Sequence, residues 1–181
     1  MKNIGIWIVA IIGISLSISC NNDPSLQKYF IDHQNDANFI SLDLPASLIR
    51  TDAVNLNEEE KEALNSIHKV NLLLLPLKNE EMQNAYDKET NDISNILKSD
   101  TYETLIRFGS NDTKVVLKSL GEENIDEVVV FATDQSKGLA LVRILGDNMK
   151  PEKMIKLARS VEQGRLDLGA LKEIAEGISI D

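Results

Sequence analysis

The sequence has a single cysteine, Cys20, and only two histidines, His33 and His68. A lone cysteine forms no disulfide within the chain, so the fold depends on its hydrophobic core. A zinc site built on the two histidines would draw on Asp32, His33, Asp36 and His68. No H-x-x-x-H or H-E-x-x-H spacing relates these residues, and we therefore expect no metal site.

Signatures of known enzyme classes are missing as well. The chain has no G-x-S-x-G nucleophile elbow, no G-x-G-x-x-G fingerprint and no phosphate-binding loop. Adjacent acidic residues occur at 58–60, 80–81 and 122–123. Carboxylates in the first turn of a helix or in a turn between strands are usually solvated rather than catalytic. We predict no catalytic residue and no cofactor.

Positive charge is scarce, because 29 aspartates and glutamates outnumber 19 lysines and arginines and give a net charge of −10. Such an acidic surface repels nucleic acid, so we expect no nucleic-acid partner. Apolar residues make up 43% of the sequence, an ordinary value for a globular protein, and 181 residues suit one core. We expect one domain over residues 25–181, monomeric by itself.

The N-terminal segment differs in composition from the rest. Lys2 precedes an uncharged, mostly apolar run at 4–18, and the small residue Ser19 comes just before Cys20. A positive start, a short apolar run and small residues at its end are typical of a secretory signal. The run is shorter than the roughly 20 residues that a membrane-spanning helix needs. We predict that residues 1–19 are a cleaved signal peptide.

The residues around Cys20 resemble the lipobox of bacterial lipoproteins, although Ser17 stands where leucine is usual. The resemblance implies that Cys20 carries diacylglycerol and a further acyl chain such as palmitate, and that residues 20–24 form a short tether. Acylation would also exclude Cys20 as a thiol nucleophile. The alternatives are an uncleaved anchor and an ordinary secretory signal. An uncleaved anchor would not explain why the only cysteine follows the apolar run.

Lipidation would place the protein on a membrane of a gram-negative cell envelope. Asn21 is not the aspartate that retains some lipoproteins at the inner membrane, which favours the outer membrane. Its periplasmic and surface faces stay equally open. The expected partners are the membrane, through the lipid on Cys20, and an envelope protein.

Helical spacing of apolar residues predicts several helices after the tether. Asn57 and Glu60 match a capping box at the start of one of them. Gly109 and Gly164 are suitable helix ends. The predicted helices lie at about 26–33, 46–50, 57–67, 79–98, 101–108 and 151–163, with a last one beginning at Asp167.

Strands are predicted at 39–44, 70–77, 113–120, 127–133 and 139–145. The run 70–77 is apolar on both faces, which indicates an interior strand. In the segment 113–120, Lys114 and Lys118 alternate with apolar residues, as in a strand with one side in solvent.

Short, turn-rich connections join the last three strands and indicate an antiparallel meander. Strands and helices do not alternate strictly along the chain, which argues against a parallel sheet. We predict an α+β fold with a mostly antiparallel sheet of about five strands and helices packed on one face.

Four stretches carry a family resemblance. They are SLQKYF (25–30), FISLD (39–43), YETLIRFG (102–109) and LVRILG (141–146). With them the chain resembles a bacterial envelope family catalogued as domain of unknown function 4252, over nearly all of the mature chain. The resemblance implies a lipoprotein and supplies no activity and no site residues.

Two arginines are candidate anion contacts. Arg143 interrupts an otherwise apolar strand, and Arg107 lies near the end of a predicted helix. One hypothesis is that both form an anion pocket, because arginine binds carboxylate or phosphate through two parallel hydrogen bonds. The other is that each points outward and pairs with Glu127 or Glu103.

Three functions are compatible with these observations. The favoured one is a non-enzymatic envelope lipoprotein that acts as an accessory or interaction module at the membrane surface. The second is a small envelope hydrolase or transfer enzyme whose site forms only in the folded chain. The third is an anion- or glycan-binding module that uses Arg107 and Arg143. A concave site with converging polar groups would favour the second or third, and a flat apolar patch would favour a partner interface.

Overall fold

The computed structural model describes residues 25–49 and 55–166. The predicted signal peptide, the lipidation site Cys20, the tether and the helix expected from Asp167 lie outside these residues.

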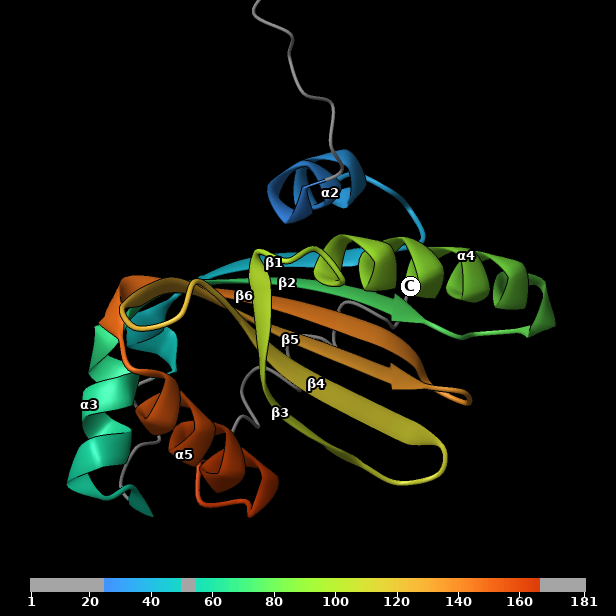
Figure 1. The fold of residues 1–181 in the computed structure, drawn as a ribbon. Coiled ribbons are helices and arrows are strands. Elements are labelled where there is room, and N and C mark those ends of the chain that lie inside the picture. Colours follow the sequence, from blue (N-terminus) through green and yellow to red (C-terminus); the bar gives the residue numbers. More distant parts are fainter. Residues whose placement is uncertain (1–24, 50–54, 167–181) are drawn as a thin grey trace, which may run out of the picture.

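A six-stranded antiparallel sheet forms the centre of the described structure (Figure 1). The spatial order of the strands is β1-β2-β6-β5-β4-β3. Strands β4 to β6 form the predicted meander, β3 extends it by pairing with β4, and β6 pairs with β2. The strands are β1 Ile40–Pro45, β2 Ile67–Pro76, β3 Tyr102–Gly109, β4 Thr113–Leu120, β5 Ile125–Asp134 and β6 Gly138–Met149.

Four α-helices and two short 3₁₀ helices accompany the sheet in the described residues. The predicted capping box is present: Glu60 N donates to Asn57 Oδ1 at 2.9 Å, and Asn57 N donates to Glu60 Oε2 at 2.8 Å. The helices are α2 Leu26–His33, η1 Ala46–Leu48, α3 Glu58–Ser66, η3 Glu80–Met82, α4 Gln83–Leu97 and α5 Pro151–Glu162.

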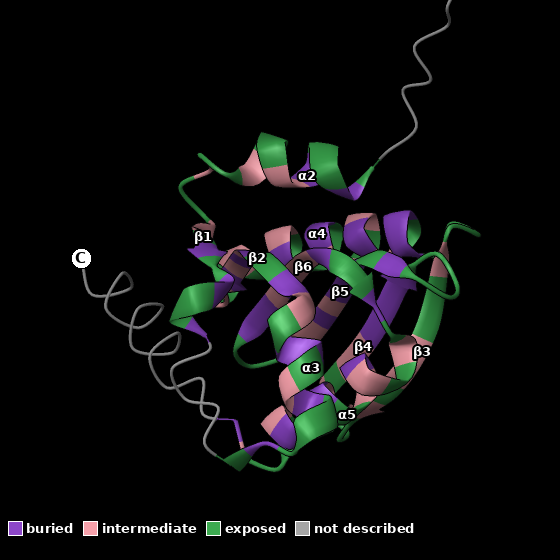
Figure 2. Ribbon diagram, turned by 90° about the vertical axis from the view of Figure 1, so that its left-hand side faces the viewer, coloured by how far each residue is buried: buried purple, intermediate pink, exposed green. Residues whose placement is uncertain are grey.

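The helices cover both faces of the sheet, whereas one covered face was expected. Val128 of β5 belongs to a core cluster that includes residues of α3 and α5, and the next residue, Val129, belongs to a second cluster with residues of α2 and α4. Successive side chains of a strand point to opposite faces, so the two clusters lie on opposite sides. Figures 1 and 2 show α2 and α4 on one side of the sheet and α3 and α5 on the other.

The α+β class and the antiparallel sheet are confirmed, with six strands instead of about five. The additional strand is β3, which was predicted as a helix over 101–108. Tyr102, Ile106 and Phe108 favour a strand as readily as a helix, and pairing of β3 with β4 decides between the two. Gly109 ends this element as expected, but it ends a strand, with φ of +140°.

The leucine-rich run is interior, as predicted. It lies in β2, which pairs with β1 on one side and with β6 on the other. Leu73 and Leu75 are buried against the α2 and α4 side, and Val70 against the α3 and α5 side. Among the described helices, none has the length and apolar character needed to cross a membrane.

Candidate functional site

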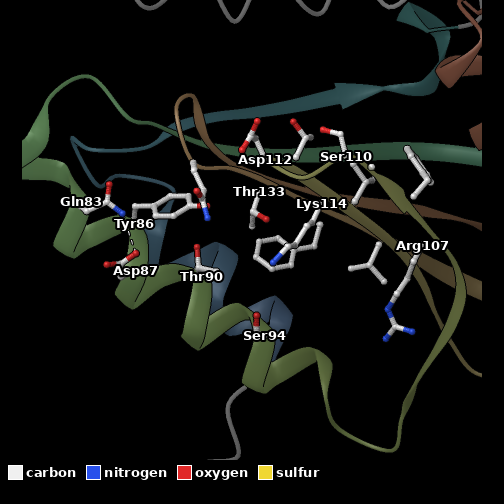
Figure 3. Close-up of a pocket in the computed structure, with 17 residues that line it drawn as sticks. Gln83, Tyr86, Asp87, Thr90, Ser94, Arg107, Ser110, Asp112, Lys114 and Thr133 are labelled. Atoms are coloured by element: carbon white, nitrogen blue, oxygen red, sulfur yellow. Dashed lines mark hydrogen bonds between the residues drawn. The ribbon is translucent and has the colours of Figure 1, made fainter.

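A groove of about 990 Å³ lies between α4 and strands β3, β4 and β5 (Figure 3). Helix α4 is held to the sheet by Ile93, Ile96 and Leu97, which are buried with residues of β2, β5 and β6. Beside this contact, the polar side of α4 faces the meander. The groove therefore forms because α4 covers only part of this face of the six-stranded sheet.

Uncharged polar side chains make up much of the groove wall. From α4 and from the strands and their connections, they are Gln83, Thr90, Ser94, Ser110, Thr113, Thr133 and Gln135. The hydroxyl of Thr90 is buried and has no hydrogen-bond partner within the described part of the chain. Tyr86 and Phe131 add aromatic side chains. By residue type the lining is therefore mostly polar, with a smaller apolar part.

Arg107 and Lys114 bring positive charge into the groove. Arg107 is exposed on β3, and its Nη2 donates to Thr104 Oγ1 at 3.3 Å. Lys114 is exposed on β4. Figure 3 shows both side chains across the groove from Thr90 and Ser94 of α4. Of the two arginines that the sequence singled out, Arg107 thus lines the groove, from a strand and not from a helix.

Lys118 lies on the same strand but is not in solvent, contrary to the sequence expectation. It is 9% exposed, and its Nζ donates to the main-chain oxygens of Leu97 and Tyr102, the latter at 3.0 Å. The amine therefore caps the C-terminal end of α4, where carbonyl groups lack helical partners. Burial lowers the pKa of Lys118, and the charge of Arg107 lowers it further.

Arg143 has a different environment. Its Nε and Nη2 donate to Glu127 Oε2 of the neighbouring strand β5 at 2.8 and 2.5 Å, and both side chains are largely buried. Tyr102 Oη donates to the other carboxylate oxygen at 3.2 Å. Burial and the Glu127 charge raise the pKa of Tyr102, which keeps its hydroxyl a donor. The pairing of Arg143 with Glu127 in the second hypothesis is present, but Arg143 is largely buried and does not point outward.

A second, smaller pocket of about 400 Å³ lies between α2 and strands β1, β2 and β6, and Arg143 lines it. Three of its polar side chains are paired with one another: Lys69 Nζ donates to Asp43 Oδ2 at 2.7 Å, and Asn71 Nδ2 donates to Asp43 Oδ1. The Lys69 contact lowers the pKa of Asp43.

The structure does not bring Arg107 and Arg143 together. They line different pockets. Their strands, β3 and β6, are separated by β4 and β5, which corresponds to roughly 14 Å across the sheet. The anion pocket formed by both arginines is therefore not present.

The two histidines have different contact partners. His33 Nε2 lies 3.3 Å from Glu89 Oε2, and His33 Nδ1 lies 2.8 Å from the carbonyl oxygen of Tyr29. His68 Nε2 lies 2.7 Å from Asp147 Oδ2 at the surface. Within residues 25–49 and 55–166, no three His, Cys, Asp or Glu side chains converge as metal ligands would.

Comparison with known families gives one match. The model of the family described as Domain of unknown function (DUF4252) matches residues 29–157. The chain belongs to this family. No curated protein and no solved structure shows significant similarity to it. The matched range contains α4 and strands β3 to β5, so the groove is part of the DUF4252 domain itself.

Sequence reasoning missed most of this groove. Lys114 and Lys118 are four positions apart on one strand, and an even spacing indicates that they share a face. The assignment of 101–108 to a helix removed Arg107 from that face. The groove of this DUF4252 domain could be recognised only once β3 was paired with β4.

Proposed function

We propose that this protein is a non-enzymatic lipoprotein of a gram-negative cell envelope, and that its domain is a binding module held at the membrane surface. The anchor is argued from the sequence, in which Cys20 directly follows an uncharged run. Helix α2 begins at Leu26, and a tether of about five residues spans at most roughly 20 Å. The domain would thus work close to the lipid headgroups.

The groove beside α4 is the observation that carries the binding role. Its volume of about 990 Å³ is at the upper end of the range for ligand pockets, roughly 300–1,000 Å³. Its wall supplies hydroxyl and amide groups together with two cations that have no carboxylate partner in the described structure.

A photo-crosslinking experiment in the native cell tests this function. A benzophenone amino acid replaces Ser94, which lines the groove, or Asn95, the next residue of α4, which is exposed and does not line it. We expect a discrete adduct from position 94 and none from position 95. Thr133→Trp, which fills the groove floor, should abolish the adduct.

Two results would contradict the binding role. One is the absence of any adduct at position 94 in cells that express the protein at its normal level. The other is the same adduct pattern from positions 94 and 95, which would indicate random collision instead of a bound ligand.

A further inference from the structure

Three cations lie on one face of the β3–β4 hairpin. Arg107 is directly opposite Val116 in the register of the two strands. Lys114 and Lys118 are each two residues from Val116 on β4, so their side chains share its face. Val116 packs in the core cluster on the α2 and α4 side, which places all three cations on the side that α4 partly covers.

The charges of these three residues are not neutralised by carboxylates in the described structure. Arg107 contacts a threonine hydroxyl, and Lys118 contacts two main-chain carbonyl oxygens. No contact with a carboxylate is found for Lys114. By contrast, Arg143 on the same face is paired with Glu127. A positive face persists here in a chain whose net charge is −10. Such a face attracts an anionic group.

The other residues that line the groove indicate which class of ligand would carry the anionic group. Val116 is partly buried and lines the groove, and the edges of the buried Tyr86 and Phe131 rings lie beside it. A free phosphate or a sugar acid has no apolar side chains for these positions. A peptide has both acidic and apolar side chains, and its main-chain amides suit the glutamine and hydroxyl groups of the wall.

The length of the groove is also that of a short peptide. From Gln83 to Ser94, α4 rises about 17 Å at 1.5 Å per residue. An extended chain covers this length with roughly five residues at 3.3 Å each. We propose that the groove binds an extended peptide segment of a partner protein, with an acidic side chain seated between Arg107 and Lys114.

The groove is also asymmetric, which gives the bound segment a direction. Asp87 of α4 and Asp112 of the β3–β4 turn line it too, and Figure 3 shows Asp87 toward the end opposite to Arg107. Asp87 accepts a hydrogen bond from Gln83 Nε2 at 3.0 Å. A second acidic side chain at that end would be repelled, so one acidic position is expected in the ligand and not a run of them.

This inference rests on the proposed binding function, and a random heptapeptide display library can test it. The library is selected on the full-length lipidated chain in detergent, after removal of peptides that bind the groove-filled Thr133→Trp variant. We expect the surviving peptides to share one acidic position. Replacing that acid by its amide should weaken binding to the wild-type chain by roughly tenfold or more, the effect of a lost charge-assisted contact.

Variants of the protein give the reciprocal test. Arg107→Gln and Lys114→Gln should each reduce affinity for the acidic peptide and leave affinity for the amide peptide unchanged. Arg159→Gln on α5 and Lys98→Gln just after α4, both exposed and outside the groove, are the matched controls and should change neither affinity.

Other outcomes separate this inference from the function on which it rests. Groove-dependent peptides that lack a shared acid would overturn the anionic preference and leave the groove as a binding site. No groove-dependent peptide, together with a persistent adduct at position 94, would overturn the peptide class. If glucuronic acid or inorganic phosphate alone bound with the same dependence on Arg107, a small anion would replace the peptide.

Discussion

The hydroxyl of Tyr29 on α2 donates a 2.6 Å hydrogen bond to the carboxylate of Glu89 on α4, and both residues are buried. The ring of His33 stacks on Tyr29, with 4.0 Å between centroids. Burial and the neighbouring Glu89 raise the pKa of Tyr29, so the phenol stays a donor at neutral pH. This contact fastens the first described helix, the one nearest to the predicted lipid, to the helix that borders the groove.

Tyr29→Phe should destabilise the domain by about 1–2 kcal/mol, because the Glu89 carboxylate loses a donor while it remains buried. The matched control is Tyr86→Phe on α4, whose hydroxyl has no hydrogen bond to any described residue. It should change the free energy of unfolding by less than about 0.5 kcal/mol. Urea unfolding of both variants is the measurement. Equal effects would show that the Tyr29–Glu89 bond contributes nothing specific.

A buried Glu60 predicts a defined loss of stability in acid. Its carboxylate accepts hydrogen bonds from Arg165 Nη1 and Nη2 at 2.8 and 2.7 Å and from Ser160 Oγ at 2.5 Å. Arg165, with Ser160 and the main chain of Asn57, lowers the pKa of Glu60 from 4.5 to about 2. Between these values the unfolded chain binds the proton and the folded chain does not. Stability from this group is therefore complete above about pH 4.5 and declines as the pH falls toward 2.

Glu60→Gln isolates this contribution. At pH 7 it should cost about 1–3 kcal/mol, because the charge-assisted bonds to Arg165 are lost. The difference in unfolding free energy between wild type and variant should shrink as the pH falls from 4.5 toward 2. Glu58→Gln, in an exposed ion pair with Lys61 on the same helix, is the control and should show no such convergence. A constant difference down to pH 2 would contradict the assignment.

The interior position of β2 makes Leu73 intolerant of charge. Leu73 is 0% exposed and lies between Ser41 of β1 and Leu141 of β6. Leu73→Asp buries a carboxylate without a partner and should cost more than about 4 kcal/mol, enough to unfold a domain of ordinary stability. Lys114→Asp, at an exposed position of β4, should cost less than about 0.5 kcal/mol. A wild-type denaturant midpoint for Leu73→Asp would refute the interior role.

Lys118→Met should loosen the end of α4. The main-chain oxygens of Leu97 and Tyr102 lose their shared donor, which should cost about 1–3 kcal/mol of folding free energy. Removal of a buried charge stabilises the domain and offsets this cost only in part. Hydrogen exchange should accelerate for amides of the last turn of α4. Lys98→Met, an exposed neighbour, should leave exchange unchanged. A more stable Lys118→Met domain would mean that the burial penalty exceeds the value of the cap.

Cys20→Ser tests the anchor independently of the fold. If Cys20 carries the lipid, the substitution abolishes metabolic labelling with a fatty-acid probe and releases the protein from membranes. The wild-type protein should have a mass that lacks residues 1–19 and includes acyl chains. Labelling that persists in the variant, or an intact N-terminus in the wild type, would contradict lipidation.

Several features were readable from the sequence because their causes are local. The capping box at Asn57 and Glu60 needs only residues three apart. The meander from 113 to 149 follows from short turns between apolar strands. Three of the four stretches that carried the family resemblance lie inside the matched range, and the first, 25–30, overlaps its start. The interior position of 70–77 followed from leucines on both faces of one strand, because both must be covered.

Other features were decided by contacts between distant residues. The segment 102–109 has no local preference strong enough to choose strand over helix, and pairing with β4 chose the strand. The sequence pattern indicated a surface lysine at position 118. Its amine instead donates to the carbonyl oxygen of Leu97 at the end of α4, a contact that depends on how α4 packs on the sheet. Arg143 and Glu127 are 16 residues apart and meet only because β5 and β6 are neighbours. The groove has the same origin. Its walls come from α4 and from strands β3 to β5, and only tertiary packing brings these elements together.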